Sequence, residues 1–190
     1  TGTPLSSIVQ LSNTPVVDNP PSLTWNGAEF AVTWNSEVAG AIQVFLARVD
    51  LDGVEIGMET ALTANPESSL QVDHAWTGDG YGVAWSDERH GPGEIYFALV
   101  DRDGTKTSAD VRVTNDVAPS IEPSIAWTGD GFSIVWRDER DGTGEIYFAR
   151  VSPTGVKLGA DVRVTYSVLS SEHPEPGAPA HCVRWRQKDG

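Results

Sequence analysis

The sequence predicts an all-β fold of the β-propeller type, and two features lead to that prediction. Tryptophans recur every 51 residues, in one set at Trp25, Trp76 and Trp127 and in a second set at Trp34, Trp85 and Trp136. Within each repeat, short segments of alternating apolar and polar residues lie between Gly, Asn and Asp turns, which is typical of antiparallel hairpins. No segment has helical apolar spacing of useful length. A long period filled with short strands indicates blades stacked around an axis.

The first repeat shows where the strands of one blade are expected. Four antiparallel strands are predicted there, at residues 23–25, 30–34, 42–49 and near 60–63. The second and third repeats carry the same pattern, with turns at 77–80, 101–104, 128–131 and 152–155. The repeated Trp, Tyr and Phe residues are expected to form the core between blades.

The repeats divide the chain into five predicted parts. Residues 1–19 hold the outer strand of an incomplete blade and a connection, because Ser7–Leu11 matches the last strand of the later repeats. Three blades per chain follow, at 20–69, 70–120 and 121–170, and an aberrant tail at 171–190 replaces a fourth. Prolines stand in this tail where a central strand is expected. It is either an out-of-frame remnant of blade four or a natural C-terminal arm.

Three blades cannot close a ring alone, because an open array leaves two apolar blade faces in water. We therefore expect closure by oligomerisation, as a homodimer with six blades related by a two-fold axis.

Composition excludes several classes of partner. The net charge of −14 and the pI near 4.5 disfavour nucleic acid and anionic membranes. No run approaches the roughly 18 apolar residues of a membrane span, and no signal segment opens the chain, so we expect no membrane partner. The single Cys182 cannot form an internal disulfide.

Two matching stretches carry a family resemblance. Trp85–Phe97 and Trp136–Phe148 both contain Asp-Glu-Arg followed by Glu-Ile-Tyr-Phe. They resemble the repeats of TolB-type and related sialidase-like β-propellers of bacterial secreted proteins, and the similarity covers about residues 20–165. The resemblance implies a periplasmic or extracellular location. Blade one departs from it at Asn35–Val38 and Gln43–Phe45, and no sialidase catalytic residues are matched.

One end of the predicted propeller collects polar residues. The loops that lead into the inner strands hold Asn19, Gln71, Glu122 and His173. Ligands that converge on an axis suit a hard divalent cation such as Ca²⁺, so we predict a metal site from these four residues. The Asp-Glu-Arg loops share this end, but repetition in turns favours a structural role. In that role the Asp caps the turn, the Arg pairs with a carboxylate and the Glu faces solvent.

Asp73 and His74 stand out because they depart from the repeat. They occupy the positions of Ser22-Leu23 and Ser124-Ile125 in the other blades. An ionisable pair on an inner strand could act as a catalytic base and its orienting group, so we predict Asp73 and His74 as catalytic residues. The alternative is a buried histidine satisfied by one hydrogen bond.

Two functions follow from these candidates. The first is a metal-dependent hydrolase of small-molecule ester, lactone or phosphoester substrates, with Asp73 and His74 at the channel mouth. The second is a non-catalytic propeller that binds a protein or a glycan through its loop face. We favour the first, because the irregular ionisable residues gather at one mouth.

Overall fold

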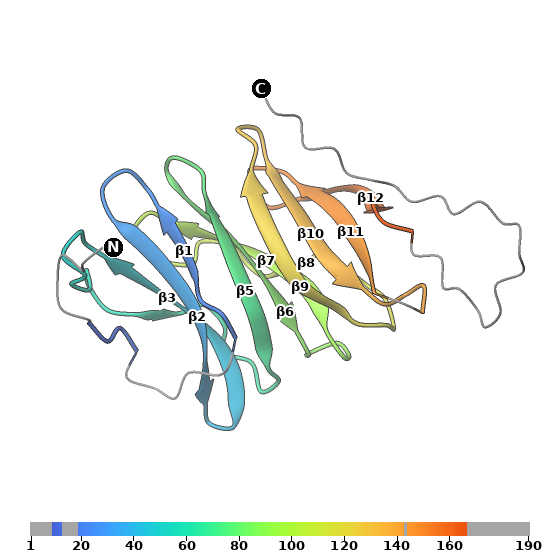
Figure 1. Cartoon of the computed structure of the whole chain (residues 1–190), viewed down its shortest axis with the longest axis horizontal. Coiled ribbons are helices and arrows are strands. Elements are labelled where there is room, and N and C mark those ends of the chain that lie inside the picture. The colour runs from blue at the N-terminus through green and yellow to red at the C-terminus, as the bar shows by residue number, and fades with distance from the viewer. Residues whose placement is uncertain (1–8, 13–18, 143, 167–190) are drawn as a thin grey trace, which may run out of the picture.

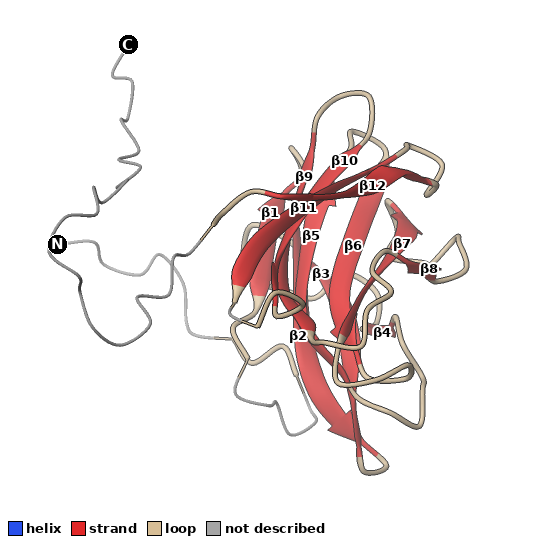
Figure 2. Ribbon diagram, turned by 90° about the vertical axis from the view of Figure 1, so that its right-hand side faces the viewer, coloured by secondary structure: helices blue, strands red, loops and turns tan. Residues whose placement is uncertain are grey.

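The structure is a computed structural model, and it describes residues 9–12, 19–142 and 144–166. The predicted tail at 171–190, with His173, lies outside the described residues. Twelve strands make three four-stranded antiparallel sheets (Figures 1 and 2). The sheets pack face to face in chain order, with the second sheet between the first and the third. No helix occurs among the described residues, so none there could cross a membrane.

Each sheet is one repeat, folded as a meander in chain order. The first sheet contains β1 (Ser22–Trp25), β2 (Phe30–Val38), β3 (Ala41–Val49) and β4 (Thr60–Ala61). The second contains β5 (Ser69–Trp76), β6 (Gly80–Asp87), β7 (Glu94–Asp101) and β8 (Val111–Arg112). The third contains β9 (Ser120–Trp127), β10 (Phe132–Asp138), β11 (Glu145–Val151) and β12 (Lys157–Arg163). The prediction of an all-β fold with three four-stranded antiparallel units is therefore confirmed.

Strand β2 is longer than its sequence pattern suggests. Its alternation ends at Trp34, yet it pairs with β3 as far as Val38 opposite Ala41. The added residues Asn35 and Ser36 are polar and fully buried. Asn35 donates a hydrogen bond to the Ser69 carbonyl, and its side-chain oxygen accepts one from Gln71 N. In this part of β2 the buried polar side chain of Asn35 is therefore stabilised by hydrogen bonds to the next sheet, and not by apolar packing.

Apolar cores fill the two spaces between neighbouring sheets. Between the first and second sheets, Leu46 and Val44 pack against Trp85, Tyr81 and their neighbours. Between the second and third sheets, a similar cluster buries Phe97 and Phe132 with ring centroids 4.9 Å apart. The inner strands β1, β5 and β9 lie side by side, and contacts link β5 to both of the others.

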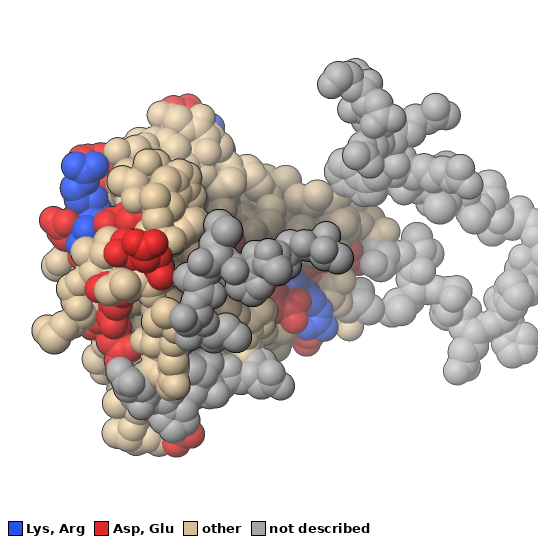
Figure 3. All heavy atoms as spheres, turned by 60° about the vertical axis from the view of Figure 1, so that its left-hand side comes forward, with Lys and Arg blue, Asp and Glu red and all other residues tan. Residues whose placement is uncertain are grey.

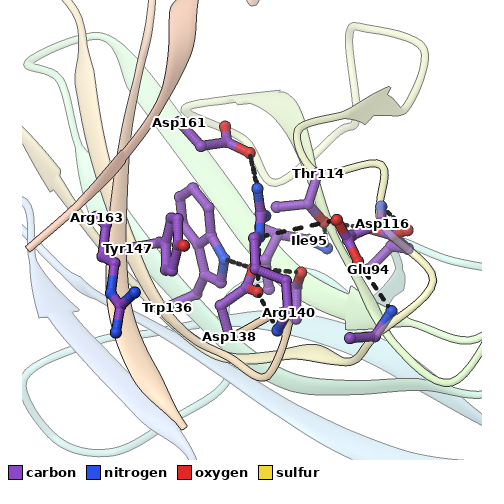
Figure 4. Close-up of polar contacts among 12 residues, drawn as sticks. Glu94, Ile95, Thr114, Asp116, Trp136, Asp138, Arg140, Tyr147, Asp161 and Arg163 are labelled. Atoms are coloured by element: carbon purple, nitrogen blue, oxygen red, sulfur yellow. Dashed lines mark hydrogen bonds and ion pairs between the residues drawn. The ribbon is translucent and has the colours of Figure 1, made fainter. Parts of the chain in front are cut away.

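The Asp-Glu-Arg motif has a structural role, because its Asp and Arg side chains fix the loop by hydrogen bonds and ion pairs. In the third sheet, Asp138 is fully buried and accepts hydrogen bonds from Trp136 Nε1 at 2.7 Å, from Ser120 Oγ and from the Arg140 guanidinium (Figure 4). Arg140 also reaches Asp161 at 3.2 Å and stacks on the Tyr147 ring. The same contacts recur one repeat earlier, at Asp87, Trp85, Arg89, Asp110 and Tyr96. The structural reading of this motif therefore accounts for its contacts.

Candidate functional site

The Asp73 carboxylate bridges the three inner strands. It accepts hydrogen bonds from Ser22 Oγ at 2.6 Å on β1 and from Ser124 Oγ at 3.1 Å on β9, and it also bonds Ile125 N and its own neighbour His74 N. Four donors occupy most of the lone pairs of this carboxylate. Its described contacts hold the sheets together around the axis.

The His74 ring is buried between the first two sheets. Only 3% of the residue is exposed, and its Nδ1 lies 3.0 Å from Thr33 Oγ1. Its Nε2 has no hydrogen-bond partner among the described residues, and the ring meets Tyr81 edge-on at 5.8 Å. Burial lowers the pKa of His74 to about 4, against the opposing effect of the Asp73 charge. The imidazole is therefore neutral near pH 7. No hydrogen bond joins it to the Asp73 carboxylate in the part of the chain that the structure describes.

Three of the four predicted metal ligands line one pocket. This mouth pocket, of about 350 Å³, is lined by Asn19, Pro20, Gln71, Val72, Glu122 and Pro123. Strands β5 and β9 each carry one extra residue here, which shifts their register against β6 and β10. At these bulges Gln71 and Glu122 take left-handed φ angles of 53° and 57°.

At the mouth pocket a described hydrogen bond links the bulge of β5 to the bulge of β9. Gln71 Oε1 accepts a hydrogen bond from Glu122 N at 3.0 Å, so one of the predicted ligand oxygens is already in use. The described residues contain no group of three or more His, Cys, Asp or Glu placed to hold a metal ion. The fourth predicted ligand, His173, lies outside the described residues. The four-residue metal site therefore stays a prediction.

A second cavity lies at the opposite end of the sheets, and the sequence reasoning missed it. The Trp76 cavity, of about 350 Å³, is lined by Asn26, Ala28, Glu29, Arg48, Trp76, Arg102 and Asp103. These residues come from the β1–β2 turn, from β3, from the end of β5 and from the turn after β7, so the cavity spans the boundary between the first two sheets. The half-buried Trp76 packs on Tyr81 at 4.8 Å between ring centroids.

The polar groups of the Trp76 cavity are fixed by one another. Arg48 donates to both oxygens of Glu29, at 2.6 Å and 3.1 Å, and its Nη1 lies 3.4 Å from Asp103 Oδ1. The hydrogen bond to Glu29 raises the pKa of Arg48 above its ordinary value. Asn26 donates to the Tyr81 hydroxyl at 3.1 Å, and burial raises the pKa of Tyr81. The cavity therefore presents an aromatic ring beside a rigid frame of charged and amide groups.

The corresponding cavity between the second and third sheets has a different lining. It has about 330 Å³ and contains Trp127, but Gly80, Leu99 and Pro153 stand where the first has Glu29, Arg48 and Arg102. The two cavities are built from the same strands and turns of successive repeats, so the fold does not require Glu29, Arg48 and Arg102. This departure from the repeat is visible in the sequence and is the signal that could have found the site.

On the face shown in Figure 3, acidic side chains (red) are more numerous than basic side chains (blue). This agrees with the net charge of −14.

Comparison with solved structures supports the architecture. The fold is similar to that of an endo-arabinase from Bacteroides thetaiotaomicron VPI-5482, with a TM-score of 0.53 at 15% identity over 82% of this chain and 66% of that one. This chain has a β-propeller-like fold. An α-L-arabinofuranosidase from Clostridium thermocellum ATCC 27405 gives a TM-score of 0.48 at 12% identity, over 80% of this chain and 57% of that one. The chain thus spans less than two thirds of the length of either neighbour. No protein-family model and no curated protein matches the sequence.

The comparisons correct the predicted activity. We expected a metal-dependent hydrolase of ester, lactone or phosphoester substrates, and that expectation is wrong. The endo-arabinase, whose fold this chain resembles, is not described as an esterase, lactonase or phosphoesterase. The propeller resemblance stands, but no comparison singles out the TolB-type or sialidase-like repeats.

Proposed function

We propose that this chain is a non-catalytic β-propeller that binds a glycan, and that the Trp76 cavity is its binding site. The observation that carries the proposal is the meeting of one indole ring with the side chains of Asn26, Glu29 and Arg48 in a cavity of about 350 Å³. Pockets of roughly 300–1,000 Å³ are the usual size for small-molecule sites.

The chemistry of a sugar ring matches both parts of this cavity. A pyranose or furanose ring has a face of C–H groups that packs on an aromatic ring, and a rim of hydroxyls that donate and accept hydrogen bonds. The Glu29 carboxylate accepts hydrogen bonds from hydroxyls, and Arg48 donates hydrogen bonds to them. The amide of Asn26 already bonds Ala28 N, Glu29 and Tyr81, so it shapes the wall of the cavity. Because Glu29 and Arg48 are already held by their bidentate contact, little side-chain entropy is lost on binding.

The structural neighbours bear on the choice of ligands to test. The endo-arabinase shares the fold, and its name points to a sugar polymer as its substrate. We therefore place arabino-oligosaccharides first among the neutral ligands. The loop-face binding that we predicted from the sequence lies at the opposite end, at the mouth pocket, so the two ends can be separated by mutation.

Calorimetric titration with a panel of neutral and acidic oligosaccharides tests the proposal. The variant Glu29→Gly/Arg48→Leu gives the cavity the residues found at Gly80 and Leu99 in the next repeat, and so keeps a lining that the fold tolerates. We expect it to weaken glycan binding by about tenfold to a hundredfold, the loss typical of hydrogen bonds to charged groups.

The matched control is Arg150→Leu, which makes the same change at the same repeat position in the third sheet. Arg150 is exposed, pairs with Asp130 and lies away from the Trp76 cavity. This variant should bind glycans as the wild type does. A panel in which no glycan binds the wild type, or a double variant with unchanged affinity, contradicts the proposed function.

We also propose that a second copy of the chain covers the outer face of the third sheet. Val135, Ile146, Val162 and Val164 are 36–55% exposed there. They occupy the repeat positions of Ala84, Ile95, Val111 and Val113, which pack against the third sheet. A homodimer is the predicted form, and a solution mass equal to that of one chain would contradict it. We also keep as proposals the resemblance to TolB-type and sialidase-like repeats and the periplasmic or extracellular location that it implies.

A further inference from the structure

Two acidic and two basic residues line the Trp76 cavity, and one of the basic residues makes no ion pair with the described residues. Glu29 pairs with Arg48, and Arg48 also pairs with Asp103. Arg102 lines the same cavity and is exposed, but no carboxylate or other hydrogen-bond partner contacts it among the residues that the structure describes. Its positive charge acts on the nearby Tyr81 hydroxyl, where it opposes the rise in pKa that burial causes.

Arg102 is exceptional among the residues that the structure describes. Every other Lys and Arg in the described part forms an ion pair with Asp or Glu: Arg48, Arg89, Lys106, Arg112, Arg137, Arg140, Arg150, Lys157 and Arg163. The chain has 27 acidic residues and only 13 Lys and Arg, so carboxylate partners are abundant. An arginine that faces a cavity without one is available to an anion from outside.

The fold does not need a cation at this position. Arg102 is the second residue of the tight turn between β7 and β8, and the other two repeats place Leu51 and Pro153 there. The turn is closed by the Gly104 N to Asp101 carbonyl hydrogen bond and by the Asp101 side chain, not by Arg102. A structural role in the turn therefore does not explain the guanidinium.

We propose that the glycan bound in the Trp76 cavity carries a carboxylate, as a uronic acid unit does, and that Arg102 binds that carboxylate. This rests on the proposed function, because it names the class of sugar at the same site. In this arrangement the C–H face of the ring packs on Trp76 and the hydroxyls meet the Glu29–Arg48 pair. The planar guanidinium of Arg102 can donate two parallel hydrogen bonds to a carboxylate.

The experiment compares each acidic sugar with its own neutral counterpart. Oligosaccharides of glucuronate, galacturonate and mannuronate are titrated by calorimetry into the wild type, and so are the same oligosaccharides after reduction of their carboxyl groups to alcohols. We expect the wild type to bind at least one acidic member about tenfold or more tightly than its reduced form, the gain of one charge-assisted contact. Added salt should narrow that difference, since exposed charges are screened.

The variant Arg102→Leu carries the residue of the first repeat and should fold normally. It is expected to bind the acidic and the reduced sugars equally well, at the affinity of the wild type for the reduced form. Arg150→Leu is the control, and it should keep the full preference for the acidic sugar.

The outcomes separate the two proposals. Equal binding of acidic and reduced sugars by the wild type, or a preference that survives in Arg102→Leu, overturns the carboxylate assignment and leaves glycan binding intact. An Arg102-dependent preference for a sulfated oligosaccharide, with none for any uronate, also overturns it. Failure of every sugar to bind overturns the proposed function as well.

Discussion

Replacing His74 with leucine is expected to make the protein less sensitive to acid. Leu23 stands at the same position of the first repeat and Ile125 at that of the third, so the inner strand accepts an aliphatic side chain there. The exchange also removes the buried Nε2 that has no partner among the described residues. The exchange also takes the Nδ1 partner from the buried Thr33 hydroxyl, which offsets that gain, so the test rests on the change of stability with pH and not on its value at pH 7.

The loss of unfolding free energy at low pH follows from the pKa of His74, which burial lowers from 6.5 to about 4. Because the unfolded chain binds the proton more readily than the folded chain, the stability contributed by neutral His74 is complete above pH 6.5 and is lost as the pH falls toward 4. At about pH 4.5 the loss amounts to about 2.5 kcal/mol, at about 1.4 kcal/mol for each pH step between the two pKa values. This cost is absent from His74→Leu.

Urea unfolding at about pH 7 and at about pH 4.5 measures this directly. The quantity of interest is the difference in unfolding free energy between the wild type and His74→Leu, because titrations that the two proteins share cancel in it. The difference should grow by about 2.5 kcal/mol in favour of the variant at the lower pH. Met58→Leu, a change at an exposed side chain that does not titrate, is the control and should follow the wild type. A difference that does not change with pH would refute the reasoning.

Two further changes test the packing of the third sheet by urea unfolding. Asp138→Asn should destabilise the protein by about 3 kcal/mol, because it leaves the Arg140 guanidinium without its closest partner. Asp130→Asn, at an exposed carboxylate, should leave the stability close to that of the wild type. Equal effects of the two substitutions would contradict the structural role of Asp138. Gly82→Ala should cost about 1–3 kcal/mol, because the added Cβ would lie 2.2 Å from the Phe132 ring. A neutral Gly82→Ala would show that the boundary between the sheets is loosely packed.

The strands could be predicted from sequence because their signals are local. Alternation and turn residues placed β1 and β3 to within one residue, and the turn at 101–104 was predicted at its observed place. The extension of β2 to Val38 could not be predicted in this way. Its buried Asn35 is satisfied by Ser69 and Gln71 of the next sheet, and such partners are not visible in a local pattern.

The Trp76 cavity was missed for a related reason. Its side chains come from four separate segments and meet only across the boundary between two sheets. The repeat nevertheless held a signal, because Glu29 replaces Gly80 and Arg102 replaces Pro153. The same comparison drew attention to Asp73 and His74, whose described contacts lie within the core and around the axis.

The linear order of the three sheets has a consequence for unfolding. The middle sheet is covered on both sides, so that β6 is buried along nearly its whole length, whereas β10 and β11 alternate between buried and less buried residues. In an array where each unit contacts only its neighbours, local opening begins at the ends and moves inward. Amide hydrogens of β6 should therefore exchange last, and those of β12 well before them.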